Sequence, residues 1–456
     1  MILSLIIFNS VFLGLIQFKA YKKKLDIIDL LILLNVFYFG IWPLFYLMGN
    51  NSEYLDQEEI KVLSCAITFL VFILIWIINL LIVQTLKFPK YNSFVNLDSI
   101  IFKSINISNS KIFFLVIFII LFIIYGFFTY SISKSFSFDG MAELGINLPF
   151  WYLSIFSSIR MLILLSIIIL SIKYFISKNK IFLFFLILIT LISLIFGKAG
   201  LISHIILIYF LYLKISNGHL CKLKLFVPII LLLFFTLLAF NFFEKIRSGL
   251  LAPSAYDNVN AGASKTFISK AKNINLETLM NFDTVIEKLN KRPSVFKFNV
   301  MILDWQLSKN KYNYVTYGEM LFSSALNLVP RYIWHSKPEN NLQKNILFPK
   351  YNETYINFQA PSILGFTIAD FGFLAVIIFP LLIIALLLIT IFLSSIFYKH
   401  NLSYLTLFSG LLYNFLSVEA NYDSYILVLR NSLFFAILFL VFSLSLKGGL
   451  SAKRNH

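Results

Sequence analysis

The sequence predicts an all-α polytopic membrane protein with about 11 transmembrane helices and one large, mainly helical outer loop. Three observations support this class. Of the 456 residues, 59% are hydrophobic and only 13% are charged, about half the charged share of a soluble domain. The apolar residues are collected in runs about long enough to cross a bilayer. Between the runs, basic clusters alternate with acidic ones, as expected of loops on opposite sides of a membrane.

The composition also excludes two other classes of protein. Aromatic residues make up 18% of the chain, whereas disordered proteins contain few aromatics. The formal net charge is +17, but most of the basic residues lie in short loops between apolar runs. This placement follows the positive-inside rule and does not indicate a nucleic-acid partner.

Eleven apolar runs define the predicted spans. The sixth and seventh are short and are joined only by Gly197-Lys198-Ala199-Gly200, which is also compatible with a hairpin that stops below the outer surface. The runs are Met1 to Phe18, Ile27 to Met48, Val62 to Leu86, Ile112 to Tyr130, Phe150 to Ile172, Ile181 to Phe196, Leu201 to Leu213, Phe226 to Phe243, Phe371 to Ser394, Leu402 to Val418 and Tyr425 to Leu446.

Loop charges predict the orientation of these spans. Alternate loops are rich in lysine, beginning with Lys19 to Lys24, whereas the opposite loops carry acids such as Glu53 and Asp56. The N-terminus is therefore expected outside and the C-terminus in the cytoplasm. The predicted parts are an N-terminal membrane domain, an outer loop domain, a C-terminal membrane segment and a cytoplasmic tail, at residues 1–243, 244–361, 362–446 and 447–456.

The outer loop domain is too long to be a structureless connection, so we expect it to fold, mainly as helices. The predicted helices are 264–290, a second segment from Pro293 through Leu307, and a third from Glu319 to Val329 that Pro330 stops. The domain is net positive, which long translocated segments tolerate. Its simplest partner is an anion presented at the outer membrane surface.

The same domain holds the sequence run with the clearest chemistry, which extends from Tyr317 to Pro338. It predicts an apolar helix that ends at Pro330-Arg331. An aromatic turn follows, and Lys337 comes after the turn. On a rigid turn, Arg331 can bind a diphosphate through two parallel hydrogen bonds, while Lys337 adds a second positive charge. The alternative is that both cations contact phospholipid head groups. The sequence has no metal-ligand pattern and no nucleotide-binding glycine loop, so no metal and no cofactor is expected.

Together with Asp370-Phe371-Gly372, this run resembles a known family. Tyr317-Gly318, then Val329-Pro330-Arg331, Trp334 and Lys337-Pro338 look like the oligosaccharide repeat-unit polymerases of the O-antigen polymerase (Wzy) type. The specific motifs cover only about Tyr317 to Gly372. Where many such relatives have a Gly-Glu pair this chain has Gly365-Phe366, and where they often have an arginine between two mid-chain spans it has Lys198.

The resemblance implies a membrane glycosyltransferase of the GT-C type in the bacterial inner (cytoplasmic) membrane. Such an enzyme polymerises undecaprenyl-diphosphate-linked oligosaccharide repeat units into O-antigen or related surface polysaccharide at the outer face. Its partners would be these lipid-linked oligosaccharides, membrane lipids and a chain-length regulator protein. A lipid diphosphate is an activated leaving group, so the reaction needs cations for its developing charge and one general base.

The residues that could meet these demands are few. His335 and Glu319 flank the Pro-Arg turn and are the favoured bases, while Trp334, Tyr332 and Tyr317 could stack on sugars, although interfacial belts also place aromatics at this depth. Cations at span ends can reach head groups instead, and Arg430 has acidic neighbours that could pair with it. The candidate diphosphate ligands are Arg331, Lys337, Arg292, Arg247, Lys198, Arg160 and Arg430.

Two other functions stay open at this stage. The first is a flippase or other transporter of the same lipid-linked units, which would favour repeated halves and charged residues inside spans of both halves. The second is an O-antigen ligase, which shares the transferase architecture. The chain has no detectable internal repeat and concentrates its polar residues in one outer loop. These features favour an outer-face polymerase.

Overall fold

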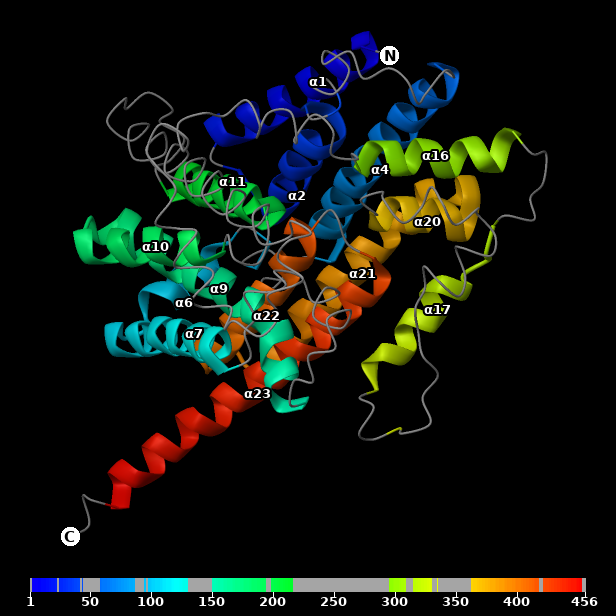
Figure 1. Cartoon of the computed structure of the whole chain (residues 1–456). Helices are drawn as coiled ribbons and strands as arrows, with labels where there is room; N and C mark the ends of the chain where they lie inside the picture. The colour runs from blue at the N-terminus through cyan, green and yellow to red at the C-terminus, as the bar shows by residue number, and fades with distance from the viewer. Residues whose placement is uncertain are drawn as a thin grey trace, which may run out of the picture. The chain divides into compact units, whose positions relative to one another are not determined.

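All the regular structure described in the computed structural model is helical (Figure 1). Within the described residues no strand occurs. The all-α class predicted from composition is therefore confirmed for this part of the chain. The structure describes residues 2–22, 24–41, 43, 58–86, 94–95, 97–129, 150–193, 198–215, 295–308, 315–329, 334, 362–417 and 421–452.

Four helical segments in the described residues are long and apolar enough to cross a membrane, and a bent pair of helices raises the number to five if it counts as one span. Their length and apolar composition suggest a membrane protein. The segments are Glu59–Ile82, Ser158–Ser177, Ile363–Ile396, Tyr422–Leu444 and the pair Asp98–Ile105 with Asn109–Tyr125, which is bent by 94°.

Every predicted span outside 226–243, which lies beyond the described residues, coincides with a helix. The total of eleven crossings stays a prediction, because several of these helices are shorter than a bilayer-spanning segment. In chain order the helices are α1 (Ile2–Tyr21), α2 (Ile27–Val36) continued by η1 (Phe37–Ile41), α4 (Glu58–Leu86), α6 (Asp98–Ile105), α7 (Asn109–Thr129), α9 (Phe150–Ser177), α10 (Lys180–Ser193), α11 (Lys198–Ile215), α20 (Ile363–Phe371), η9 (Gly372–Leu374), α21 (Ala375–Ile396), α22 (Asn401–Leu416) and α23 (Tyr422–Ala452).

The outer loop contributes short helices to the described structure. The second predicted segment appears as α16 (Val295–Ser308). The third appears as α17 (Glu319–Ala325) followed by the single turn η7 (Leu326–Leu328). The first, 264–290, lies outside the described residues. Proline punctuation therefore predicted the two described segments to within a few residues.

The chain divides into two compact units, one made of Met1–Lys103 with Asn290–His456 and the other of Ser104–Leu289. In the first unit α21 contacts α4 and α22, α22 contacts α23, and α16 contacts α20. In the second unit α9 contacts α7, α10 and α11. The side chains of α9 from Ile159 to Ile172 are almost all fully buried, so α9 is the core helix of that unit.

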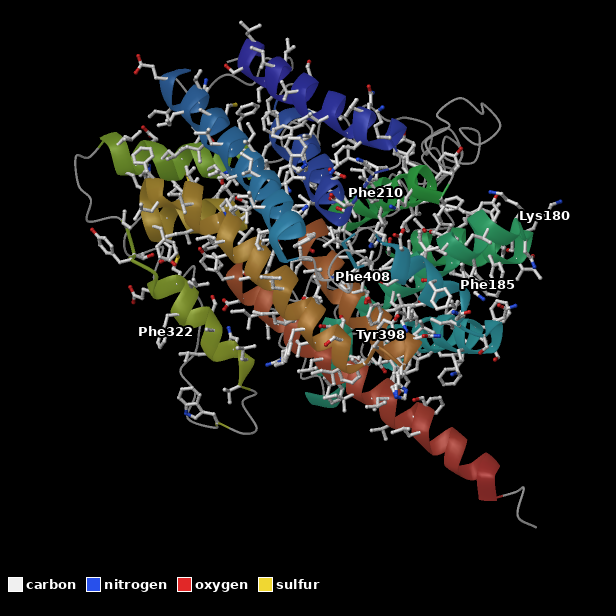
Figure 2. The ribbon with its side chains drawn as sticks, turned by 180° about the vertical axis from the view of Figure 1, so that it is seen from behind. Lys180, Phe185, Phe210, Phe322, Tyr398 and Phe408 are labelled. Atoms are coloured by element: carbon white, nitrogen blue, oxygen red, sulfur yellow. The ribbon has the colours of Figure 1, made fainter. Side chains whose placement is uncertain are left out.

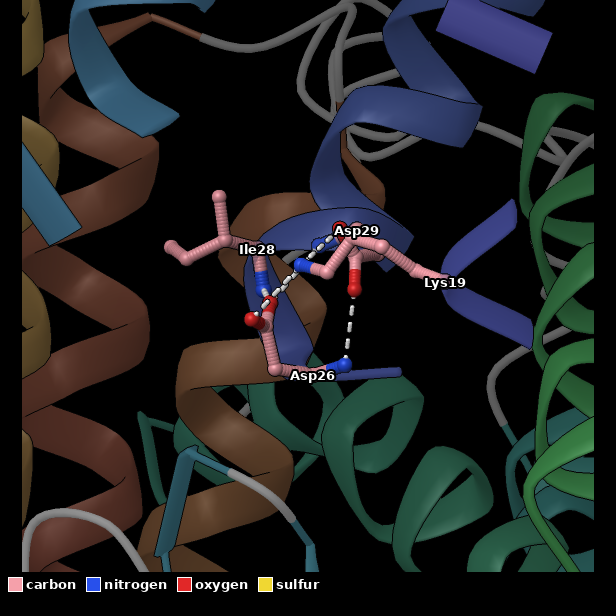
Figure 3. Close-up of polar contacts among 4 residues, drawn as sticks. All are labelled: Lys19, Asp26, Ile28 and Asp29. Carbon is pink, nitrogen blue, oxygen red and sulfur yellow. Dashed lines mark hydrogen bonds and ion pairs between the residues drawn. The ribbon is translucent and has the colours of Figure 1, made fainter. Parts of the chain in front are cut away.

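A buried ion cluster joins the end of α1 to the start of α2 (Figure 3). The Lys19 ammonium lies 2.9 Å from an Asp26 carboxylate oxygen and 2.6 Å from one of Asp29. Asp29 also accepts a hydrogen bond from the Asp26 backbone N–H at 2.8 Å. The Lys19 and Asp29 side chains are only 13% and 2% exposed. One cation is therefore paired with two carboxylates in a place largely shielded from solvent.

Helices α16 and α20 approach so closely that only glycine fits at one position. A Cβ atom at Gly365 would lie 2.5 Å from the Asn299 amide oxygen and 2.5 Å from the ring of Phe298. Both neighbours are fully buried side chains on α16. The Ser362 hydroxyl strengthens the contact, because it donates to the Asn299 amide oxygen at 2.8 Å and accepts from the Gly365 N–H at 2.9 Å.

We expect Gly365→Ala to destabilise the protein by about 1–3 kcal/mol, the usual cost of overpacking a rigid core. Thermal unfolding of the purified protein in detergent measures the loss. Gly14→Ala in α1 is the matched control, because nothing lies within 4 Å of the Cβ it would add. Equal unfolding temperatures for the two variants would contradict a tight α16–α20 contact.

Candidate functional site

The N-terminus of α17 is bound by a carboxylate from a membrane span. Asp370 lies in the last turn of α20 and is fully buried. Its Oδ1 accepts from the Thr316 hydroxyl, from the Gly318 N–H at 3.0 Å and from the Met320 N–H at 3.3 Å. Its Oδ2 accepts from the Leu321 N–H at 3.1 Å. The first N–H groups of a helix have no partner within it, and here a buried anion serves as that partner.

The backbone segments on either side of the Asp370 contact are also packed closely against each other. The Thr316 N–H donates to the Ala369 carbonyl at 3.2 Å. Gly318 has φ of +87°, and a Cβ there would lie 3.3 Å from the Phe371 ring. Gly372 has φ of +59°, so both glycines adopt the left-handed conformation that other residues avoid. The two motifs Tyr317-Gly318-Glu319 and Asp370-Phe371-Gly372 thus form one structural element.

The other end of the same segment is bonded to α23. The Asn327 side chain in η7 donates to the Asp423 carboxylate at 2.5 Å. The Arg430 guanidinium donates to the Asn327 carbonyl at 3.1 Å and to the Asn431 amide oxygen at 3.3 Å. Segment 319–328 is therefore joined by charged side chains to α20 at its start and to α23 at its end. Both helices belong to segments able to cross a membrane.

Between these two attachments α17 exposes an apolar face. Tyr317 is 75% exposed and Phe322 is 72% exposed. In Figure 2, Phe322 lies on the side of α17 away from the other helices. Met320 and Ser324 on the opposite side are fully buried. Leu328, Val329 and Trp334 are also exposed, so aromatic and aliphatic surface extends along the segment that leads to Pro330-Arg331.

Helix α16 adds one more polar contact to the α20 end of the site. The Gln306 side chain donates to the Ile368 carbonyl at 2.9 Å, two residues before Asp370. On the same helix Asp304 has a buried Oδ1 with no hydrogen-bond partner. Burial raises the pKa of this carboxyl above its usual value, because desolvation disfavours the charged form.

The structure brings four of the sequence-predicted site residues into the first unit. Tyr317 and Glu319 lie at the start of α17, and both are exposed. Arg430 contacts the end of η7, and Trp334 is 37% exposed. Arg160 lies in α9 of the second unit, half-buried, and Lys198 begins α11 there. The remaining predicted site residues, Arg331, Lys337, His335, Tyr332, Arg292 and Arg247, lie outside the described residues.

Sequence reasoning missed the role of Asp370 and misplaced the start of its span. The predicted span begins at Phe371, whereas the helical segment begins at Ile363. The prediction thus leaves Asp370 outside the span. The carboxylate is accommodated because four donors surround it. The available signal was the pair of glycine-containing motifs about 50 residues apart, each of which suggests a special backbone conformation.

No family model, no curated protein and no solved structure matches this chain. In the part of the chain that the structure describes, no three or more His, Cys, Asp or Glu side chains gather into a group able to hold a metal ion.

Proposed function

We propose that this chain is a membrane glycosyltransferase that polymerises lipid-diphosphate-linked oligosaccharide repeat units at the outer face of the bacterial inner membrane. The donor would be a growing polysaccharide on undecaprenyl diphosphate, and the acceptor would be another lipid-linked repeat unit. The growing chain would pass to the acceptor, and undecaprenyl diphosphate would leave. The proposal rests on the resemblance of the motifs between Tyr317 and Gly372 to the Wzy-type polymerases.

One structural observation gives this proposal its main support. Tyr317-Gly318-Glu319 and Asp370-Phe371-Gly372 are far apart in sequence but meet through the Asp370 carboxylate. Arg430 then contacts the carbonyl of Asn327, four residues before Arg331. Segment 319–328 is thus fixed at both ends, and preorganised cations are most effective in stabilising developing charge. Arg331 follows this segment in the sequence and lies outside the described residues.

Each step of the proposed reaction is assigned to particular residues. An acceptor hydroxyl oxygen attacks the anomeric carbon of the donor sugar, and the bond from that carbon to the diphosphate oxygen breaks. The hydroxyl proton passes to Glu319 or His335 as general base. Arg331 and Lys337, with Arg430 beside their segment, neutralise the departing diphosphate. The rings of Tyr317, Tyr332 and Trp334 offer faces for sugars. Arg160, Lys198, Arg247 and Arg292 remain further candidate cations.

Arg331→Ala tests this function in a strain that lacks the chromosomal copy of the gene. We expect the variant protein to be inserted at wild-type level while long polysaccharide is lost, so that lipid A carries single repeat units. Gel banding of surface polysaccharide measures the result. Arg454→Ala, in the predicted cytoplasmic tail, is the control and should restore the full ladder.

Two outcomes would overturn the proposal. A wild-type ladder in the Arg331→Ala strain would remove the diphosphate role of this residue. Loss of even single surface repeat units in the deletion strain would indicate a flippase instead, because a polymerase acts after the units have crossed the membrane.

A further inference from the structure

The second unit carries a cluster of lysines at one end of its helices. Lys173 near the end of α9 donates to the Ile107 carbonyl at 2.7 Å and to the Asn109 side chain at 3.2 Å, at the start of α7. Lys178 occupies the turn between α9 and α10 with φ of +57°. We call the five lysines at this end of the second unit the lysine rim. They are Lys111, Lys173, Lys178, Lys180 and Lys214.

Ring contacts show that these lysines share one end of the unit. Phe113 packs 6.3 Å from Phe182 between ring centroids, which places the starts of α7 and α10 together, each two residues beyond a rim lysine. Phe175 and Tyr212 lie 5.5 Å apart, which places the ends of α9 and α11 together. Lys214 is therefore at the same end as Lys178.

The described part of the second unit contains no acidic residue that could balance the lysine rim. The described residues of the second unit, 104–129, 150–193 and 198–215, contain no aspartate and no glutamate. Lys111, Lys178 and Lys180 are exposed, and Figure 2 shows Lys180 at the outer end of α10. An ammonium group has three donors, and Lys173 uses two of them for Ile107 and Asn109. Among the described residues of this unit the rim is thus a strongly positive surface.

The rim lies where a membrane surface would be. Segment Ser158–Ser177 can cross a membrane and ends one residue before Lys178. The long arm of the bent pair begins at Asn109, two residues before Lys111. Immediately beside the lysines, Phe184 is 62% exposed and Ile181 is 53% exposed. Phe114 and Ile176 are exposed as well. Cations at a span end, next to exposed apolar side chains, suit a molecule with an anionic head and apolar tails.

We propose that the lysine rim binds the anionic head groups of phospholipids in the leaflet that it faces, with their acyl chains against the exposed apolar side chains of α7 and α10. The proposal does not depend on the catalytic function. Each rim lysine close to the membrane surface contributes attraction, so removing a lysine lowers the preference for an anionic over a zwitterionic lipid by roughly fivefold. Salt weakens this preference, because exposed charges are screened.

The test uses the full-length protein purified in mixed micelles that contain phosphatidylcholine and phosphatidylglycerol in equal amounts. The lipids retained after size-exclusion chromatography are quantified. We expect the wild type to retain phosphatidylglycerol preferentially and Lys178→Gln/Lys180→Gln to lose most of this preference. Lys178→Arg/Lys180→Arg is the matched control, because it keeps both positive charges of the rim, and it should behave as the wild type.

Three results would overturn the proposal. The first is equal retention of both lipids by the wild type, and the second is an unchanged preference for phosphatidylglycerol in the rim variant. The third is a control variant that loses this preference as much as the rim variant does. A further arm adds inorganic phosphate at matched ionic strength, and displacement of the lipid by phosphate would show an anion site rather than a lipid surface. We expect both rim substitutions to preserve the fold, because Lys178 and Lys180 are exposed. Elution volume checks this.

Discussion

Replacing Asp370 by alanine is expected to release α17 from α20 and to abolish the proposed activity, while the spans remain inserted. The substitution leaves the Thr316 hydroxyl and the N–H groups of Gly318, Met320 and Leu321 without their acceptor. A buried donor without an acceptor costs about 1–3 kcal/mol. A short helix of 7 residues has little stability of its own, so losing several of these bonds is enough to detach it.

Detachment can be measured without reference to activity. Ser324 is fully buried on α17, so a Ser324→Cys reporter in a chain lacking Cys65 and Cys221 should react slowly with a membrane-impermeant maleimide. Adding Asp370→Ala should raise the labelling rate by at least tenfold. Asp370→Asn should act in the same direction, because its amide N–H₂ would face the N–H groups of α17 where a carboxylate oxygen now accepts.

The control for this experiment is Asp98→Asn, which removes an exposed carboxyl at the start of α6. It should leave both the labelling rate and the polysaccharide ladder unchanged. If Asp370→Ala keeps Ser324→Cys protected, the carboxylate does not hold α17. If α17 detaches while the ladder remains complete, the proposed function does not require the fixed position of α17.

Replacing Lys19 by methionine should strongly destabilise the first unit. The substitution leaves the Asp26 and Asp29 carboxylates close together in a buried place with no cation (Figure 3). Removing one member of a buried ionic group costs about 3–5 kcal/mol, since the remaining charge is uncompensated. Lys19 also lies 5.8 Å from the ring centroid of Trp76 in α4. The cluster therefore links α1, α2 and α4.

The folded yield and the thermal unfolding temperature in detergent measure this loss. Lys24→Met removes an exposed lysine of the same loop and should cost little. The triple variant Lys19→Met, Asp26→Asn, Asp29→Asn should recover part of the stability, because no buried charge remains. Equal stability of the Lys19→Met and Lys24→Met proteins, or no recovery in the triple variant, would show that the cluster is not a stabilising contact.

Much of the fold could be predicted from the sequence because its signals are local. Helix α4 (Glu58–Leu86) follows directly from an apolar run, and α16 follows from the proline that precedes it. Run length and punctuation involve neighbouring residues only, and each helix satisfies its own backbone hydrogen bonds.

The sequence could predict which residues belong to the candidate site, but not how these residues contact one another. Sequence motifs indicated Tyr317 and Glu319, and a position at a span end indicated Arg430. The structure places all three on or against segment 317–328. The guanidinium of Arg430 donates to Asn327 and Asn431, and an ion pair between Arg430 and a neighbouring acid stays a prediction. Which backbone carbonyl a guanidinium meets depends on the packing of α23, and no local pattern encodes it.

The sequence by itself determined that the chain is helical, apolar enough for a membrane, and basic mainly in its loops, because composition and run length are sums over neighbouring residues. Only the tertiary structure decided that Asp370 belongs inside a span and that Lys19 belongs in a buried ionic group. A charge becomes tolerable in an apolar place only when partners surround it. The main partners of Asp370 lie about 50 residues away, and the geometry that brings them together is a property of the folded chain.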